Sequence, residues 1–394
     1  MRVRFSISKE HKMNLRTLAE KFKDIYLIEP QGMSSAPGRV NIIGEFTDYN
    51  DGFVLPCALE FRTVVLFRAR EDTKVNVHSL DYPTEKDSFT VGEKIISGPS
   101  QWGNYIRAIV FVLIRAGYSL RGVDLLIDSN VPQGAGLSSS AALEVAVCGA
   151  FNQIADLGLT AQRIAVYGQE AENDFMDCQC GIMDQLISAK GDEGKALLID
   201  CQSLETESIS IPEDLILVII NSNYPRKLVD SEYNQRRLDC EQAAAKLGVA
   251  TLRNASMDKL VSIESKLTVN EFKRAMHVIS ENNRVIKATE ALQRNDIDSL
   301  RELMSASHQS LKDDFEVTVP ETDGLVEICQ GVLGDKGAVR MTGGGFGGAI
   351  VCLCRSEDVL KVKSAVDDNY EKQFNLKADV YVCKAGEGLK VISL

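Results

Sequence analysis

The sequence contains no long apolar segment and no recognisable leader. No apolar run approaches the ~18 residues that a membrane-spanning helix needs. The first residues, MRVRFSISKEHK, are charged and lack the apolar core of a secretory signal. We therefore expect a soluble, cytoplasmic protein with no membrane partner.

Histidine is scarce, and the cysteines do not form a zinc pattern. The four histidines are dispersed, and the ten cysteines include two C-x-C pairs, Cys178/Cys180 and Cys352/Cys354. Zinc sites usually combine a C-x2–4-C pair with a second pair of Cys or His. We expect buried, reduced thiols, a common core residue type.

Positive charge is also in deficit, with 44 Lys and Arg against 56 Asp and Glu and a net charge of −12. This balance argues against nucleic acid as a partner. A small phosphorylated ligand stays possible, because backbone N–H groups and a metal ion can bind it. The 394 residues are 44% apolar and 25% charged, which is typical of a globular protein of two or three domains.

The apolar pattern predicts an α+β fold, because long helices are mixed with strands that often follow one another directly. Strands are expected near 38–44, 53–58, 63–70, 74–79, 122–129, 195–200, 215–221, 337–342, 349–354 and 378–384. Helices are expected near 14–22, 102–116, from 140 onward, around 164–175, and near 231–246, 279–294, 296–312, 321–333 and 356–372. A domain boundary is expected near 205–213.

The segment QGAGLSSSAAL, residues 133–143, predicts a glycine-rich turn that leads into a helix near Ser140. Glycines allow close approach of a ligand, and the free N–H groups of a helix start attract anions. The segment does not match G-x-x-x-x-G-K-[ST], so any phosphate loop here is of another kind. A serine cap after a tight turn is the alternative.

The segment TGGGFGG, residues 342–348, contains G-x-G-x-x-G at Gly343, Gly345 and Gly348. A dinucleotide fold needs this motif between a strand and a helix, but an apolar, strand-like run follows here. Either the turn brings backbone close to a ligand, or it is a plain hairpin connection.

A third segment, residues 39–52, places Arg39, Glu45, Asp48 and Asp51 around a polar turn. Carboxylates and amides at a loop suit a polyhydroxylated ligand, because each sugar hydroxyl both donates and accepts hydrogen bonds. Taken alone, a solvated turn explains the segment equally well.

Together these segments resemble the three motifs of the GHMP small-molecule kinases, and one of them narrows the match to the galactokinase family. The strings that carry the resemblance are GRVNIIGEFTDYNDGFVLP, VPQGAGLSSSAALE, MTGGGFGG and CGIMDQLISAKG. The similarity covers roughly residues 14–384.

The resemblance implies two α+β domains, residues 1–208 and 209–394, with the active site in the cleft between them. The last strand is a candidate to return to the first domain. The implied reaction transfers the γ-phosphoryl group of Mg-ATP to O1 of α-D-galactose, the first committed step of galactose catabolism by the Leloir pathway. A monomer with no obligate protein partner is expected.

The resemblance also assigns roles, with Asp184 as the catalytic aspartate and Arg39 as its partner at the transferring phosphoryl group. Galactose would contact Glu45, Phe46, Asp48, Gly181 and Tyr233. ATP phosphates would contact Gly134, Ala135, Gly136, Leu137, Ser138, Ser139 and Ser140, and Mg²⁺ would bind Ser140 and Glu172. Trp102 and Tyr105 would lie at the adenine, although core packing explains these two aromatics nearly as well.

One position departs from the family pattern, because Phe46 stands where the family has a histidine near C6 of the sugar. A phenyl ring cannot form a hydrogen bond, and a lost neutral hydrogen bond is worth roughly 0.5–1.5 kcal/mol. We expect looser discrimination at C6, including acceptance of 6-deoxygalactose, with the phosphoryl chemistry intact.

Three other functions share parts of this pattern. A GHMP kinase for mevalonate or homoserine would not carry the galactokinase signature at residues 38–56. A regulatory sugar sensor without catalysis would be expected to lose part of Ser138–Ala142, Glu172 or Asp184, all of which are present. A nicotinamide oxidoreductase is suggested only by the glycines at 343–348.

Overall fold

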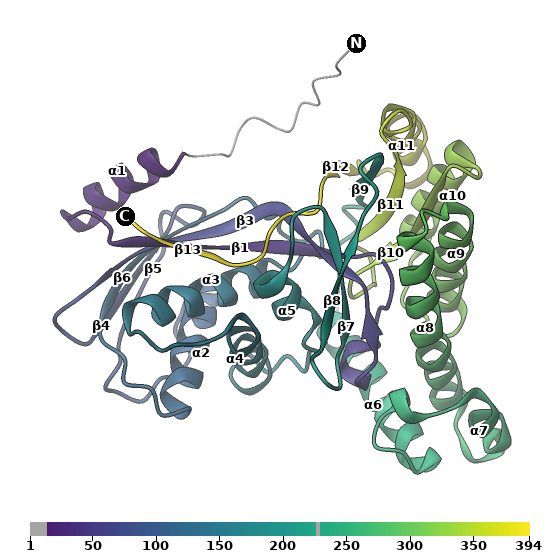
Figure 1. Ribbon diagram of the computed structural model, residues 1–394, viewed down its shortest axis with the longest axis horizontal. Coiled ribbons are helices and arrows are strands. Elements are labelled where there is room, and N and C mark those ends of the chain that lie inside the picture. The colour runs from purple at the N-terminus through teal and green to yellow at the C-terminus, as the bar shows by residue number, and fades with distance from the viewer. Residues whose placement is uncertain (1–13, 226–228) are drawn as a thin grey trace.

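A six-stranded sheet organises the amino-terminal half of the chain (Figure 1). The computed structural model describes residues 14–225 and 229–394, so the predicted absence of a leader lies outside the described residues. The strands, in spatial order, are β13 (Lys390–Ser393), β1 (Gly32–Asn41), β3 (Pro56–Ala69), β6 (Val123–Ser129), β4 (Lys74–Ser79) and β5 (Lys86–Thr90).

Both faces of this sheet are covered. Alternate side chains of a strand point to opposite sides, and apolar residues occur on both sides here. Leu125 of β6 faces the larger core, while the next residue, Leu126, packs against Phe22 of α1 (Leu15–Tyr26). The helices of the larger core are α2 (Gln101–Arg115), α3 (Ser139–Ile154), α4 (Ala161–Asp174) and α5 (Met183–Lys190). This layer holds the starts of α3 and α5 close to β1.

The carboxy-terminal half contains a second, antiparallel sheet with helices on both sides. Its strands, in spatial order, are β10 (Gly337–Thr342), β11 (Ala349–Arg355), β9 (Leu215–Asn221) and β12 (Asp379–Cys383). Val218 and Ile220 face α10 (Pro320–Leu333) and α11 (Val359–Phe374), whereas Leu217 and Ile219 face α8 (Val269–Gln293) and α9 (Ile297–Asp313). Beyond them lie α6 (Val229–Leu247) and α7 (Met257–Ser262).

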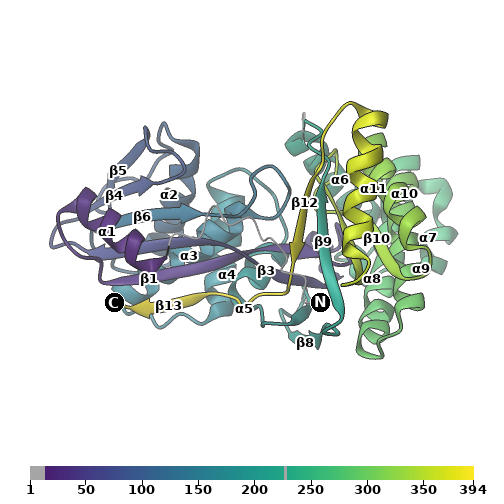
Figure 2. The ribbon, with the colours of Figure 1, turned by 90° about the horizontal axis from the view of Figure 1, so that it is seen from above.

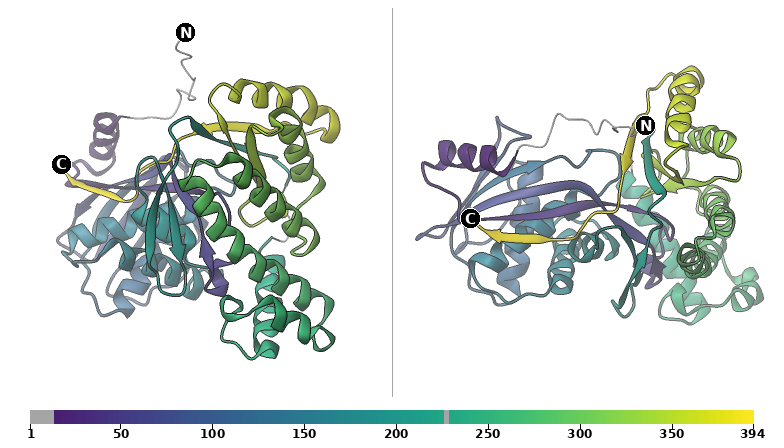
Figure 3. Two further views of the ribbon diagram at one scale, coloured as in Figure 1. Left: turned by 45° about the vertical axis from the view of Figure 1, so that its right-hand side comes forward. Right: turned by 45° about the horizontal axis from the view of Figure 1, so that its top comes forward.

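The two halves are joined by a shared core and by the end of the chain. Apolar residues of β1 and β3 pack in one cluster with residues of β9, β11 and α8. After β12 the chain runs back to the first sheet, where β13 pairs antiparallel with β1, Gly32 opposite Ser393 (Figures 2 and 3).

A third, small sheet consists of β2 (Phe53–Val54), β7 (Lys195–Asp200) and β8 (Thr206–Ser210). A domain limit near residue 208 stays a prediction.

Most predicted elements are present, and the differences occur where polar residues interrupt the apolar pattern. The strand predicted at 38–44 runs from Gly32 to Asn41, because the Ser and Pro residues at its start obscure it. Helix α8 begins at Val269 instead of 279, behind a Thr268/Glu271 capping box. Among the described residues, no helix is long and apolar enough to cross a membrane.

Candidate active site

An ion pair between Arg39 and Asp184 lies at the centre of the candidate site. Arg39, at the end of β1, donates from Nε to Asp184 Oδ1 and from Nη2 to Oδ2, both at 2.7 Å. Its remaining nitrogen, Nη1, donates to the carbonyl of Gly136 at 2.5 Å. The guanidinium is buried and the carboxylate is 28% exposed. This bidentate geometry fixes both side chains relative to one another.

The turn before α3 is held against this pair by its backbone. Arg39 N–H donates to the Leu137 carbonyl at 3.0 Å, and a Cβ on Gly38 would lie 2.5 Å from that oxygen. Ser138, which precedes α3, has a left-handed φ of 58°, and its hydroxyl donates to Asp184 Oδ2. A non-glycine residue in this region indicates a conformation imposed by its surroundings.

The predicted phosphate loop forms one wall of a cavity beside Arg39 and Asp184. Of its seven residues, Gly134, Gly136 and Leu137 through Ser140 line that cavity. Ala135 does not line it and is buried in the shared core, so its contact with the phosphates stays a prediction. Leu137 is also buried, so only its backbone is available to an anion.

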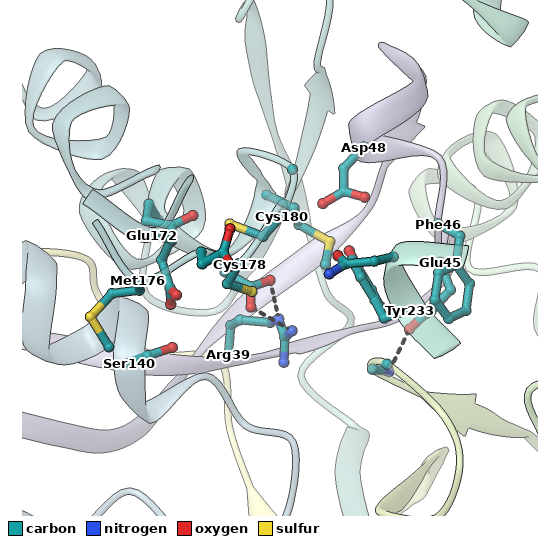
Figure 4. A pocket seen from close by; sticks show the side chains of 18 of the residues that line it. Arg39, Glu45, Phe46, Asp48, Ser140, Glu172, Met176, Cys178, Cys180 and Tyr233 are labelled. Carbon is teal, nitrogen blue, oxygen red and sulfur yellow. Dashed lines mark hydrogen bonds and ion pairs between the residues drawn. The ribbon is translucent and has the colours of Figure 1, made fainter. Parts of the chain in front are cut away.

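A larger cavity of about 350 Å³ opens between the two halves of the chain. Figure 4 shows Ser140 and Glu172 at one end, Asp48, Phe46, Glu45 and Tyr233 at the other, and Arg39 between them. The carboxy-terminal half contributes Tyr233, Asn234, Gly343 and Gly344 to its lining. The cavity therefore has two chemically different ends separated by the Arg39–Asp184 pair.

At one end, Asp48 lies directly against Gly181. A Cβ on Gly181 would lie 2.1 Å from Asp48 Oδ2, so any side chain there would displace the carboxylate. Burial, together with the charge of Asp184, raises the pKa of Asp48 to about 7. Asp48 therefore exchanges its proton near neutral pH.

Glu45 lies at the same end, but its carboxylate is already bound within the protein. Arg340 of β10 forms an ion pair with Glu45 Oε2, and both side chains are buried. Thr342 Oγ1 and the Gly343 N–H each donate to Oε1 at 3.0 Å. Burial raises the pKa of Glu45, and Arg340 opposes that effect. Sugar binding by Glu45 stays a prediction.

Phe46 belongs to an aromatic cluster, although it also lines the cavity. Its ring stacks on Phe315 with centroids 4.5 Å apart and lies 5.8 Å from the ring of Tyr233. Phe315 in turn contacts His277, at 4.7 Å between centroids. Phe46 is 4% exposed, so a polar side chain at this position would be surrounded by apolar neighbours.

At the opposite end, the buried Glu172 of α4 and Ser140 of α3 line the cavity. Glu144 is buried beside Glu172. Its burial and the negative charge of Glu172 together raise the pKa of Glu144 well above its ordinary value. Glu144 also accepts a hydrogen bond from Gln185 at 3.1 Å. Mg²⁺ commonly binds one or two carboxylates plus phosphate oxygens, so these groups fit that ion. In residues 14–225 and 229–394, no group of three His, Cys, Asp or Glu side chains is arranged as a metal cage.

A neighbouring cavity contains both aromatics predicted at the adenine. Trp102 stacks on Tyr82 with centroids 6.0 Å apart and an interplanar angle of 5°, and its Nε1 donates to Glu85. Tyr105 and Ser140 line both this cavity and the cavity between the two halves of the chain. Both stacked rings line this cavity together with Ser139 and Ser140 of the serine-rich turn, and their contact with adenine stays a prediction.

The prediction of buried thiols is right for eight cysteines and wrong for two. Cys178 and Cys180 are half-buried and line the active-site cavity, because the loop between α4 and α5 forms part of its wall. Met176 and Asn234 also line this cavity and were not predicted. Arg340 was missed as well, because it lies within an apolar strand and no local pattern marks it as the partner of Glu45.

Comparisons with known proteins identify the family of this chain. The galactokinase galactose-binding signature matches residues 20–69, and the GHMP kinase N-terminal and C-terminal domains match 104–192 and 288–372. The crystal structure of Lactococcus lactis galactokinase complexed with galactose has 35% identity and a TM-score of 0.89, covering 95% of this chain and 99% of that chain.

More distant structures share the fold alone. Mevalonate kinase from Methanococcus jannaschii has 15% identity and a TM-score of 0.62, covering 91% of this chain and 99% of that chain. Homoserine kinase from Cytophaga hutchinsonii has 17% identity and a TM-score of 0.60, covering 93% of this chain and 98% of that chain. Identity to the Lactococcus lactis enzyme and the match to the galactose-binding signature together show that the chain belongs to the galactokinase family.

Proposed function

We propose that this galactokinase transfers the γ-phosphoryl group of ATP to O1 of α-D-galactose, with Asp184 and Arg39 at the reacting atoms. The observation that carries this proposal is the bidentate Arg39–Asp184 pair, which lies between the serine-rich turn and the carboxylate-lined end of the cavity. A sugar and a nucleotide bound at the two ends would meet at this pair.

Asp184 would accept a hydrogen bond from the sugar O1 hydroxyl and take up its proton late in the transfer. Phosphoryl transfer depends mainly on positioning and charge stabilisation, so a weak base is sufficient. The hydrogen bonds from Arg39 and Ser138 fix the Asp184 carboxylate before the sugar arrives. Arg39 supplies positive charge where negative charge moves between oxygens.

The phosphates of ATP would lie along Gly134–Ser140, at the start of α3, where N–H groups and the helix dipole favour anions. Ser140 and Glu172 would hold Mg²⁺, which neutralises phosphate charge when bound. An acidic protein thereby binds a polyanionic nucleotide through backbone, hydroxyls, one guanidinium and a metal ion. Trp102 and Tyr105 would lie at the adenine.

An ADP-release assay with a panel of sugars tests the proposal. Galactose should support ADP release that depends on Mg²⁺, and glucose should support far less. Including 2-deoxygalactose, 6-deoxygalactose and N-acetylgalactosamine maps which hydroxyls matter. Absence of sugar-dependent ADP release from folded protein would refute the kinase function.

Asp48→Asn should stabilise the ligand-free protein at pH 8 while raising the KM for galactose. The folded-state pKa of about 7 lies above the ordinary value of 3.8, so between these values only the folded state keeps the proton. The Asp48 carboxyl therefore costs the folded state little below pH 3.8. As pH rises from there to about 7, the free energy of unfolding falls, because only the unfolded state gains by releasing the proton. The asparagine removes this cost, so the thermal midpoint should rise at pH 8 and change little below pH 4.

Asp51→Asn is the matched control, because Asp51 lies in the same turn but does not line the cavity. It should shift neither the thermal midpoint nor the KM. A stability gain of Asp48→Asn that is equal at pH 3.5 and pH 8 would contradict the role of burial.

Phe46→His should lower the KM for galactose, because it restores a hydrogen-bonding side chain at the sugar end. The gain is expected to be about two- to twelvefold, the value of one neutral hydrogen bond. Since the ring stacks on Phe315, the substitution also costs packing, which a lower thermal midpoint will report. The ratio of kcat/KM for galactose over 6-deoxygalactose should rise, and an unchanged or higher KM for galactose would refute the prediction.

A further inference from the structure

The loop between α4 and α5 brings two thiols into the wall of the active-site cavity. Cys178 and Cys180 are half-buried and line the cavity, whereas the other eight cysteines are buried. Figure 4 shows the pair between Glu172 and Asp48. No catalytic or binding role described above uses either sulfur.

The backbone of this loop turns tightly enough to hold the two sulfurs together. The Cys180 N–H donates to the Cys178 carbonyl at 2.8 Å, so the two residues flank a single-residue turn. Hydrogen bonding between the thiols, together with burial, raises the pKa of Cys180 well above its ordinary value. The Cys180 Sγ also donates to Asn173 Oδ1 at 3.7 Å, which ties this sulfur to α4 and leaves the first reaction to Cys178.

The same loop is attached to groups at both ends of the cavity. The Cys178 N–H donates to the Glu172 carbonyl at 3.0 Å, and Gln169 Nε2 donates to the Cys180 carbonyl at 3.3 Å. The residue after Cys180 is Gly181, which lies against Asp48. A change in the shape of this turn is thus transmitted to Glu172 and to Asp48.

We propose that Cys178 and Cys180 form a dithiol modification site, which a peroxide converts to a disulfide within the loop and thereby inactivates the enzyme. The Cys178 sulfur attacks one peroxide oxygen, the O–O bond breaks, and a sulfenic acid and one water form from hydrogen peroxide. The Cys180 sulfur then displaces the sulfenic oxygen as a second water. Two thiols are oxidised to one disulfide, and the peroxide is reduced.

Inactivation follows from the geometry of the product. A disulfide requires the sulfurs at about 2.05 Å, far closer than a hydrogen-bonded pair of thiols, so the turn must tighten. Tightening pulls on the Glu172 carbonyl and on Gly181, and misplacement of reacting groups by about 1 Å can cost about 10²-fold in rate. Dithiothreitol reverses the bond and restores the loop.

The chain contains its own control for this chemistry. Cys352 and Cys354 have the same spacing and also contact one another, but they lie buried on β11 within the carboxy-terminal core. A peroxide in solution does not reach them while the protein is folded, so this second pair should stay reduced.

The experiment treats the whole protein with hydrogen peroxide and follows activity and thiol state together. Trypsin cleavage after Arg163 and Lys190 gives one peptide with Cys178 and Cys180, and cleavage after Arg340 and Arg355 gives another with the control pair. We expect the first peptide to lose two hydrogens as kcat/KM falls at least tenfold, with recovery in dithiothreitol. The control peptide should keep its mass.

The proposal is overturned if activity is lost while both thiols of the first peptide remain, or if the disulfide forms and activity is unchanged. Cys178→Ser should abolish the dithiothreitol-reversible loss, measured as activity with peroxide over activity without it. If this variant still loses activity in peroxide and recovers it in dithiothreitol as the wild type does, the site is refuted. The inference rests on the proposed function for its activity readout, whereas the peptide masses report oxidation even if the sugar kinase assignment fails.

Discussion

Asp184→Asn is expected to remove measurable galactose phosphorylation while leaving ATP binding intact, and Asp184→Ala should do the same. The asparagine cannot accept the O1 proton, and loss of such a group commonly costs about 10²–10⁴-fold. The substitution also takes away the ion pair that fixes Arg39, so the positive charge at the transferring phosphoryl group is misplaced. Steady-state kcat and calorimetric titration with ATP in the presence of Mg²⁺ measure the two effects separately.

A matched control is available a short distance along the chain. Asp192 is exposed and forms an ion pair with Lys195 outside the cavity, so Asp192→Asn should leave kcat unchanged. Substantial turnover by Asp184→Asn would refute the catalytic role of Asp184. Loss of ATP affinity in a well-folded variant would show that Asp184 acts in nucleotide binding instead.

Arg340→Met should cause the largest loss of stability, because it leaves the buried carboxylate of Glu45 without its cation. Breaking a buried ion pair from one side costs about 3–5 kcal/mol. The pKa of Glu45, which burial already raises, should rise further, so the variant should regain stability at acid pH as that carboxyl takes up a proton. Urea unfolding at pH 5 and pH 8 measures both effects.

The double variant Arg340→Met/Glu45→Gln separates charge from packing. Removing the carboxylate charge should recover most of the lost free energy of unfolding, because the unpaired charge is the main cost. A double variant as unstable as Arg340→Met alone would show that the guanidinium acts through packing instead. The variants are compared by their free energy of unfolding and not by their activity, because Glu45 lies at the sugar end of the cavity.

Regular periodicity allowed most of the fold to be predicted from sequence, and it failed where polar residues are buried. The strands at Lys195–Asp200 and Leu215–Asn221 occur within a residue of their predicted limits, because their apolar runs are uninterrupted. The first ten residues of α8 were missed, because Glu271, Arg274 and His277 are buried polar residues there. No single-sequence rule distinguishes these from solvent-facing positions.

The candidate site could be predicted only in part, because its residues are distant in the sequence. Arg39 and Asp184 are 145 positions apart, and their pairing came from resemblance to a family instead of from any local pattern. The contact between Glu45 and Arg340 was not predicted at all, since it depends on how β10 meets the end of β1. The cysteine pair was noticed as a motif, but only the fold shows that it faces the cavity.

The pairing of β13 with β1 also constrains how the chain folds during synthesis. The first sheet needs Lys390–Ser393 as its edge strand, so it stays incomplete until these residues have left the ribosome. Contacts between such distant segments form slowly, because the loop between them must close first. Until then β1 presents an unpaired edge to solvent, a template for pairing with other chains. We therefore expect the nascent chain to be most prone to pairing with other chains before β13 has been made.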